Sequence, residues 1–254
     1  MQALHAEWTK LRTVAGTGWL LVTAVVLTVG ASAVTAEVVK CPASCSADPT
    51  KVSLTGVMLG QAAVAILAVL AISSEYSTGM IRTTLTAMPR RSAALAAKAA
   101  VVSGMVLAAG TVSTVGSVLA GRLILPGNGF TAARGFLSLG DGPTLRATAG
   151  SVLYLGLIAL LSLGLATALR DSGAAIAAVL GLLYIVPVIG DLILNPTWER
   201  RFQRYEPVNA GLAIQATRNV SKLPIGPWPG LGVLAVWAAL ALLAGGLLFR
   251  LRDA

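Results

Sequence analysis

The sequence predicts an all-α membrane protein with six transmembrane helices. Of its 254 residues, 56% are apolar and only 11% are charged, whereas soluble domains carry about 25% charged residues. Six stretches lack Asp, Glu, Lys and Arg, and each approaches or exceeds the roughly 20 residues that a helix needs to cross a bilayer. Spanning β-strands are disfavoured, because they need about ten alternating residues rather than long unbroken apolar runs.

The six apolar stretches follow one another along the whole chain. They cover residues 14–36, 52–74, 99–121, 147–168, 172–190 and 230–249. The chain is therefore expected to form one transmembrane domain over residues 1–254. A cleaved signal peptide is the alternative for the first stretch, but its apolar run exceeds the usual length of about 7–15 residues, which favours an uncleaved helix.

The positions of Lys and Arg predict the orientation of these helices. Their totals on the two sides are almost equal, so the total alone does not decide. However, Arg82, Arg90, Arg91 and Lys98 gather around a single connection, and connections rich in Lys and Arg tend to stay in the cytoplasm. We therefore expect both termini to be cytoplasmic.

The residues before the first stretch predict a short amphipathic helix. Leu4, Trp8 and Leu11 recur at i, i+4 and i+7 and share one face, while Glu7 and Lys10 lie on the other. Such a helix can lie among the lipid headgroups with Trp8 as its anchor. Trp8 and Lys10 are thus the candidate residues of an interfacial elbow.

The first outer connection contains the chain's two cysteines, Cys41 and Cys45. On the outer side they would meet an oxidising environment, so a disulfide and a pair of free thiols both stay open. A zinc site is disfavoured, because His5 is the one histidine of the chain and is expected on the opposite side. We expect no metal site.

The segment between the fifth and sixth stretches is the longest connection. Trp198, Phe202 and Tyr205 recur at i, i+4 and i+7, and Pro207 interrupts the pattern. Apolar spacing then continues to about Arg218. We expect two short helices at, or dipping into, the outer membrane face.

Pro187 lies within the fifth stretch, between two glycines. Proline removes a backbone hydrogen bond and kinks a helix, which a membrane bundle tolerates. The kink is interpreted either as a static bend or as a hinge.

The connection between the second and third stretches predicts a short helix. Ile81 and Leu85 lie one turn apart, Met80 adds to the apolar surface, and Pro89 ends the helix. This segment is either an ordinary basic loop or a docking helix whose apolar side chains enter a partner's groove.

These residues carry a resemblance to a known family. The pattern of the connection resembles the first cytoplasmic loop of ABC-2-type exporter permeases; its residues are Glu75, Gly79, Ile81, Arg82, Leu85, Pro89 and Arg91. The segments Glu7–Lys10 and Phe249–Ala254 are also similar to the ends of those permeases. The resemblance implies a coupling helix that docks on an ATP-binding subunit, an N-terminal elbow and re-entrant outer helices. It also implies a dimer of permeases in the bacterial plasma membrane.

The sequence lacks the groups that would let this chain drive transport by itself, which agrees with an energy source in a separate subunit. The six stretches hold none of the ionisable groups that proton- and ion-coupled carriers use, and the chain has no Gly-x-x-x-x-Gly-Lys-Ser/Thr motif. We therefore expect no enzyme activity and no cofactor in this chain, with ATP and Mg²⁺ bound by the partner subunit. No nucleic-acid partner is expected.

The expected function is that of an exporter permease for an apolar or amphipathic cargo, such as a drug, a lipid-like metabolite or a small peptide. The cargo class follows from the apolar spans and their neutral polar residues. The alternatives are a passive channel or structural membrane protein without an ATPase, and an ABC-linked sensor or immunity module.

Overall fold

The structure is a computed structural model that describes residues 8–9, 15–41, 47–77, 91–130 and 140–251. Its α-helices are α2 (Ala15–Val38), α3 (Pro49–Ser53), α4 (Val57–Ser77), α6 (Arg91–Ile124), α7 (Gly142–Leu169), α8 (Ser172–Leu180), α9 (Val186–Asp191), α10 (Pro196–Tyr205), α11 (Pro207–Leu212) and α12 (Pro227–Leu251). Shorter turns are the 3₁₀ segments η1 (Leu125–Asn128), η4 (Ala213–Gln215) and η5 (Val220–Lys222), and the π-helical segment η3 (Gly181–Ile185).

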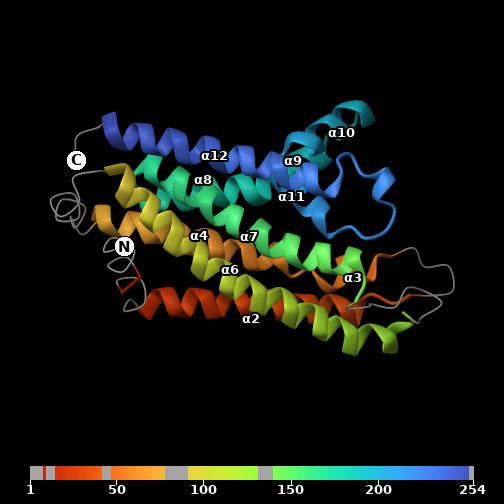
Figure 1. Cartoon of the computed structure of the whole chain (residues 1–254). Coiled ribbons are helices and arrows are strands. Elements are labelled where there is room, and N and C mark those ends of the chain that lie inside the picture. Colours follow the sequence, from red (N-terminus) through yellow and green to blue (C-terminus); the bar gives the residue numbers. More distant parts are fainter. Residues whose placement is uncertain (1–7, 10–14, 42–46, 78–90, 131–139, 252–254) are drawn as a thin grey trace.

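Six helices in the described part of the chain are long and apolar enough to cross a membrane, with α8, η3 and α9 forming one of them. The prediction of an all-helical chain with six long apolar helices is therefore confirmed for the described residues. The start of α2 and the end of α12 lie at the same end of the bundle, which we call the terminal end (Figure 1). Residues 38–41, 47–57, 124–130, 140–142 and 191–227 lie at the opposite end, the distal end.

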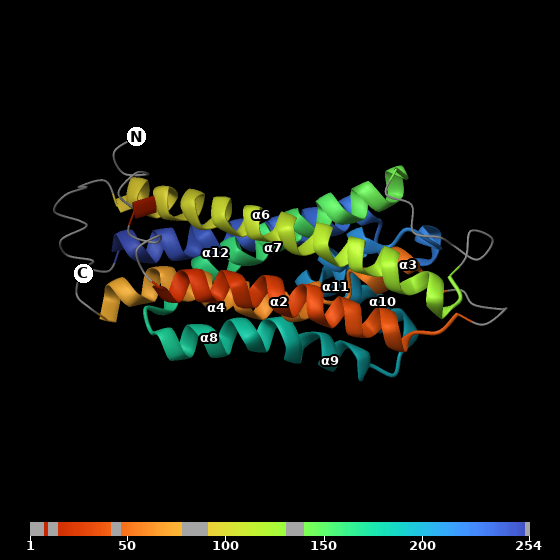
Figure 2. The same ribbon diagram turned by 90° about the horizontal axis from the view of Figure 1, so that it is seen from below.

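Helices α4 and α7 form the centre of the bundle. Helix α7 contacts α4, α6, α8 and α12, and α2 packs on α4 and α6. Helices α12 and α2 lie at opposite edges of the bundle in Figure 1, and α8–α9 lies at an edge in Figure 2. Their outward faces carry large exposed apolar side chains such as Trp19, Ile185 and Leu240. A bilayer covers such surfaces at no cost, whereas water does not.

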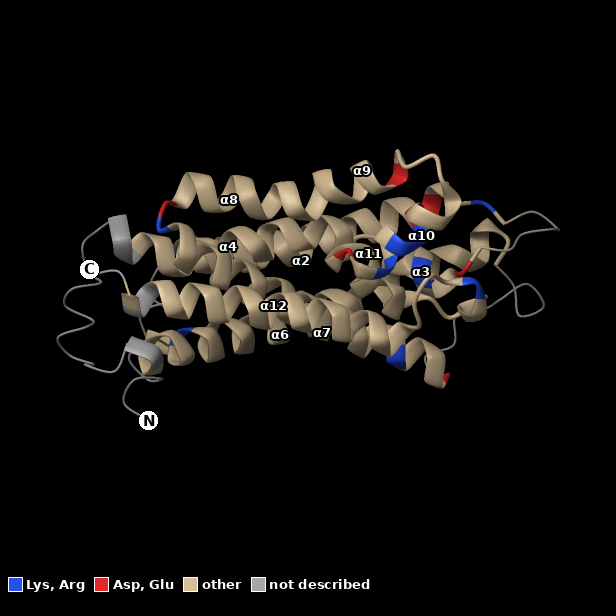
Figure 3. Ribbon diagram, turned by 90° about the horizontal axis from the view of Figure 1, so that it is seen from above, with Lys and Arg blue, Asp and Glu red and all other residues tan. Residues whose placement is uncertain are grey.

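Most charged residues of the described chain lie toward the two ends of the bundle, and an acidic segment beside α11 lies further in (Figure 3). The helical stretches between them hold no Asp, Glu, Lys or Arg across residues 15–36, 57–74, 99–121, 147–169, 172–190 and 227–249. This distribution is typical of a multi-pass membrane protein, because charges are costly in hydrocarbon.

The second spanning helix begins later than the sequence predicts. Helix α4 starts at Val57 rather than at Val52, and residues 49–53 form the separate helix α3. Asp48 caps α3, and Pro49 occupies its first turn, where a missing N–H costs nothing. The helix start at Asp48 and Pro49 therefore determines the local structure, although the apolar stretch from Val52 onward would favour one continuous helix.

The third spanning helix is longer than the stretch 99–121. Helix α6 runs from Arg91 to Ile124, and its 34 residues extend about 51 Å, beyond the roughly 30 Å hydrocarbon core. Lys98 lies two turns inside this helix and is only 2% exposed. The charge-free stretch therefore marks the membrane core rather than the ends of the helix.

The fifth spanning helix is not a regular α-helix. The N–H of Val186 donates to the carbonyl of Gly181, five residues earlier, which closes a π-helical turn. Pro187 follows directly and is buried. Because Pro187 has no N–H, the carbonyl of Leu183 lacks its usual α-helical partner, and the wider turn lies where that ladder is interrupted.

Candidate functional site

The predicted coupling residues fall mostly outside the described residues. Glu75 lies in the last turn of α4, and the remaining ones lie beyond the described ranges: Gly79, Met80, Ile81, Arg82, Leu85 and Pro89. The end of α4 and the start of α6, which flank this connection in the sequence, lie at the terminal end (Figure 1). The other connection at that end consists of Arg170 and Asp171 alone, between α7 and α8.

The elbow and the disulfide are only partly described. Trp8 lies in a helical turn and is 46% exposed, while Lys10 lies outside the described residues. Cys41 is buried and disulfide-bonded, and its N–H donates to the carbonyl of Asn128 at 2.8 Å. Cys45 lies outside the described residues, so the Cys41–Cys45 pairing and the elbow stay predictions.

Three polar side chains from separate helices meet near the centre of the bundle. The hydroxyl of Tyr154 on α7 donates to Oε1 of Gln61 on α4. The hydroxyl of Tyr184, in the π-helical turn, donates to the carbonyl of Met58 on α4 at 2.6 Å. Gln61 is fully buried, and its Nε2 has no hydrogen-bond partner among the described residues. We call Gln61, Tyr154 and Tyr184 the central polar cluster.

The other polar side chains of the spans divide into two groups. Ser117 on α6 donates across to the carbonyl of Thr28 on α2 at 3.4 Å. In contrast, Thr111, Ser113 and Ser162 donate to carbonyls one turn earlier in their own helices. The hydroxyl groups of Thr111, Ser113 and Ser162 therefore bond within their own helices, whereas Ser117 and the central polar cluster make hydrogen bonds between helices.

A network around Asp48 organises the distal end. The Asp48 carboxylate accepts hydrogen bonds from the N–H groups of Thr50 and Lys51, which begin α3. It also accepts from the N–H and hydroxyl of Thr217 and from the N–H of Arg218 at 2.9 Å. One carboxylate thus joins α3 to the segment that follows η4. The Asp-Pro pair signalled the helix start, but nothing in the sequence signalled this second contact.

The segment between the fifth and sixth spanning helices contains two short α-helices, α10 and α11, and α11 ends at Leu212, with the 3₁₀ turn η4 extending to Gln215 rather than to Arg218. Their position at the outer membrane face stays a prediction. Glu206 caps α11, with its oxygens accepting from the N–H groups of Val208 and Asn209. It is only 4% exposed, and burial raises the pKa of its carboxyl above the ordinary value, although these hydrogen bonds oppose the rise.

Helix α11 lies against the central polar cluster. A methyl group at Gly211 would come within 2.7 Å of Cε2 of Tyr154, so the backbone of α11 approaches the Tyr154 ring closely. A methyl group at Gly230 on α12 would likewise collide with the carbonyl oxygen of Ala210. These glycines allow α11 to pack deeply, and its residues Val208 and Ala210 are fully buried.

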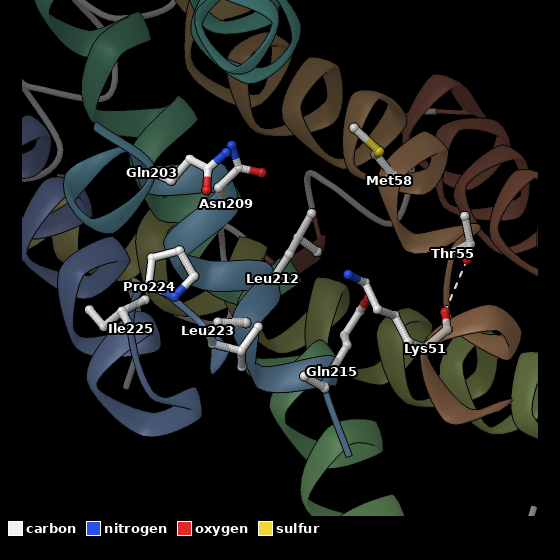
Figure 4. A pocket seen from close by; sticks show the side chains of 12 residues that line it. Lys51, Thr55, Met58, Gln203, Asn209, Leu212, Gln215, Leu223, Pro224 and Ile225 are labelled. Carbon is white, nitrogen blue, oxygen red and sulfur yellow. Dashed lines mark hydrogen bonds between the residues drawn. The ribbon is translucent and has the colours of Figure 1, made fainter. Parts of the chain in front are cut away.

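A cavity of about 300 Å³ lies on the distal side of the α11–η4 segment. Lys51, Thr55 and Met58 line one side, and Gln203, Asn209 and residues 223–225 line the other (Figure 4). Leu212 and Gln215 lie between these two sides. The lining combines one ammonium group, three carboxamides and apolar side chains, which suits an amphipathic molecule.

No protein-family model matches the chain, and a search of curated proteins finds no match. The function must therefore be argued from the chain itself.

The cavity and the central polar cluster present carboxamide, hydroxyl and ammonium groups that can form hydrogen bonds. Among the described residues, no three His, Cys, Asp or Glu side chains gather as metal ligands would. The α11–η4 segment touches the central polar cluster through Gly211 and lines the distal cavity through Leu212 and Ala213.

Proposed function

We propose that the chain is the permease subunit of an ATP-driven exporter of the ABC-2 type, located in the bacterial plasma membrane with both termini cytoplasmic. The observation that carries this proposal is the combination of six apolar helices with spans that hold no ionisable energy-converting group. Work on a cargo must then enter through another subunit, which binds ATP and Mg²⁺.

The long connection between α4 and α6 is the proposed entry point for this work. At the terminal end, α7 and α8 are joined by two residues only, which is too short to present a helix to a partner. Leaving Met80, Ile81 and Leu85 in water would cost roughly 25 cal/mol per Å² of apolar surface. A groove on the ATPase would remove this cost, with Glu75 and Arg82 fixing the orientation.

The cargo path is proposed to run between two permease copies or homologues, with the central polar cluster and the distal cavity on its route. Neutral carboxamides and hydroxyls can bind an amphipathic cargo without the desolvation cost of a buried charge. Movement of the α11–η4 segment would then release the cargo at the distal end.

The test is co-expression of the chain with the ATP-binding protein encoded by a neighbouring gene, followed by affinity purification and an ATPase assay. We expect the two proteins to co-purify and hydrolysis to rise when cargo candidates are added. Arg82→Glu and Leu85→Asp should each abolish transport and loosen the complex by a few kcal/mol, as at other interface hot spots.

Arg122→Glu is the matched control, since it reverses an exposed charge at the distal end of α6. It should leave the association unchanged. Full association and full stimulation in both the Arg82→Glu and the Leu85→Asp variants would refute the docking role. Absence of any ATPase partner would instead favour the passive-channel alternative.

A further inference from the structure

A groove of about 550 Å³ lies beside α10, with walls from the fifth spanning helix and α12. Its apolar surface includes Leu182, Val186, Ile193, Phe202 and Trp237. We call this the α10 groove. The volume falls within the range of about 300–1,000 Å³ that is typical of small-molecule sites, and the walls belong to helices whose outward faces are apolar.

The lining of the α10 groove combines a cation with an almost wholly apolar surface. Arg201 borders the groove, and its guanidinium carbon lies 5.5 Å from the centroid of the Trp198 ring, within cation–π range. Arg200 and Arg204 add positive charge along the same helix. A second apolar groove, between α6, α7 and α12, has a described lining without any charged side chain.

The one carboxylate in the lining does not cancel this charge. Glu206 is almost fully buried and directs its oxygens to the N–H groups of Val208 and Asn209 at 3.0 and 2.7 Å. These bonds, with the positive end of the α11 backbone, neutralise much of its charge locally. The accessible charge in the groove lining is therefore that of Arg201.

We propose that the α10 groove binds one anionic phospholipid, with an acyl chain along Val186, Phe202 and Trp237 and its phosphate against Arg201. An apolar groove in a membrane protein is filled by lipid chains, and an arginine at its rim selects anionic headgroups over zwitterionic ones. The site requires only that the chain spans a membrane, and does not depend on an ATPase.

The test is a lipid titration of the purified, delipidated full-length chain in detergent, followed through its thermal unfolding midpoint. Phosphatidylglycerol should raise the midpoint at lower concentration than phosphatidylcholine with the same acyl chains, and inorganic phosphate alone should not raise it. Arg201→Gln should weaken the apparent affinity for phosphatidylglycerol about fivefold, the loss expected for one arginine at a membrane surface. Arg201 is exposed, so the variant should fold.

Two matched controls distinguish specific lipid binding in the groove from non-specific attraction of anionic lipid to the positively charged helix. Arg200→Gln removes the same charge from the same helix but outside the groove lining, and should change the affinity less than about twofold. Ile193→Trp, which fills the groove, should abolish the preference for phosphatidylglycerol, whereas Leu192→Trp, at an exposed neighbour, should retain it. Equal losses in the two arginine variants, equal stabilisation by phosphatidylcholine, or stabilisation by phosphate alone would each overturn the proposal.

Discussion

At the level of single residues, the Asp48 carboxylate joins segments that lie 169 residues apart in the chain. It caps α3 and at the same time binds Thr217 and Arg218. Removing this carboxylate leaves the N–H groups of Thr217 and Arg218, and those that begin α3, without their acceptor. Most of these hydrogen bonds are partly buried, so water replaces the carboxylate only in part.

We expect Asp48→Ala to lower the free energy of unfolding by about 2–3 kcal/mol, the sum of a lost cap and lost buried hydrogen bonds. Asp141→Ala is the control, because Asp141 stands at the same position before α7 but makes no capping hydrogen bond. Denaturation midpoints in detergent measure both. Similar losses in the two variants would show that the long-range contacts of Asp48 do not matter.

Glu206 makes the stability of the distal end depend on pH. Its pKa is raised in the folded chain, chiefly by desolvation, so the folded state binds more protons than the unfolded state between the two pKa values. Stability should therefore fall as the pH rises from the unfolded pKa, near 4.5, through the folded one.

Glu206→Gln should remove this loss and flatten the dependence of stability on pH above the unfolded pKa of the Glu206 carboxyl. Glu199→Gln removes the same charge from α10 and leaves the cap of α11 in place, so it should keep the slope of the wild type. Unfolding midpoints across the pH series measure both variants. An unchanged slope in Glu206→Gln would contradict the assignment.

Among the helices, the α7–α12 pair shows how small residues permit close packing. A methyl group at Gly164 would lie 2.5 Å from the carbonyl carbon of Ala241 and 2.6 Å from the N of Leu242. These are backbone atoms, which cannot rotate away. Small residues at such contacts are typical of membrane helices, where tight packing replaces hydrophobic burial as the driving force.

Gly164→Ala should therefore separate α7 from α12 and cost about 1–3 kcal/mol, as overpacking does elsewhere. Gly104→Ala, within α6, meets nothing within 4 Å and should be neutral or slightly stabilising, because alanine favours the helix. Thermal unfolding in detergent compares them. Equal unfolding midpoints for the two variants would show that the close contact between α7 and α12 does not determine stability.

The elements differ in how far the sequence predicts them. The six spans were predictable, because length and absence of charge are properties of each segment alone. The break before Val57 and the extension of α6 beyond the apolar stretch were not, since capping and packing override hydropathy there. In the candidate site, the aromatic spacing predicted α10, but the contacts of Asp48 and of Gly211 join distant segments. Such contacts leave no local pattern in a single sequence.

For the whole molecule, the separation of charges to the two ends fixes how the bundle can lie in a membrane. With an even number of spans, the start of α2 and the end of α12 face the same compartment. The end of α4 and the start of α6, which flank the basic connection in the sequence, lie at the same end of the bundle, so the positive-inside rule predicts that this end is cytoplasmic.

Single cysteines in a Cys41→Ser, Cys45→Ser background test this orientation and the membrane-spanning state together. Leu194→Cys, at a 99% exposed distal position, should react with an impermeant maleimide in intact cells. Gly173→Cys, at the exposed start of α8, should react only after permeabilisation. Val112→Cys, which is 62% exposed in the middle of α6, should stay unlabelled in both conditions, because lipid rather than water covers it. The opposite labelling of Leu194→Cys and Gly173→Cys would reverse the orientation and place the α4–α6 connection outside, where no cytoplasmic ATPase can reach it.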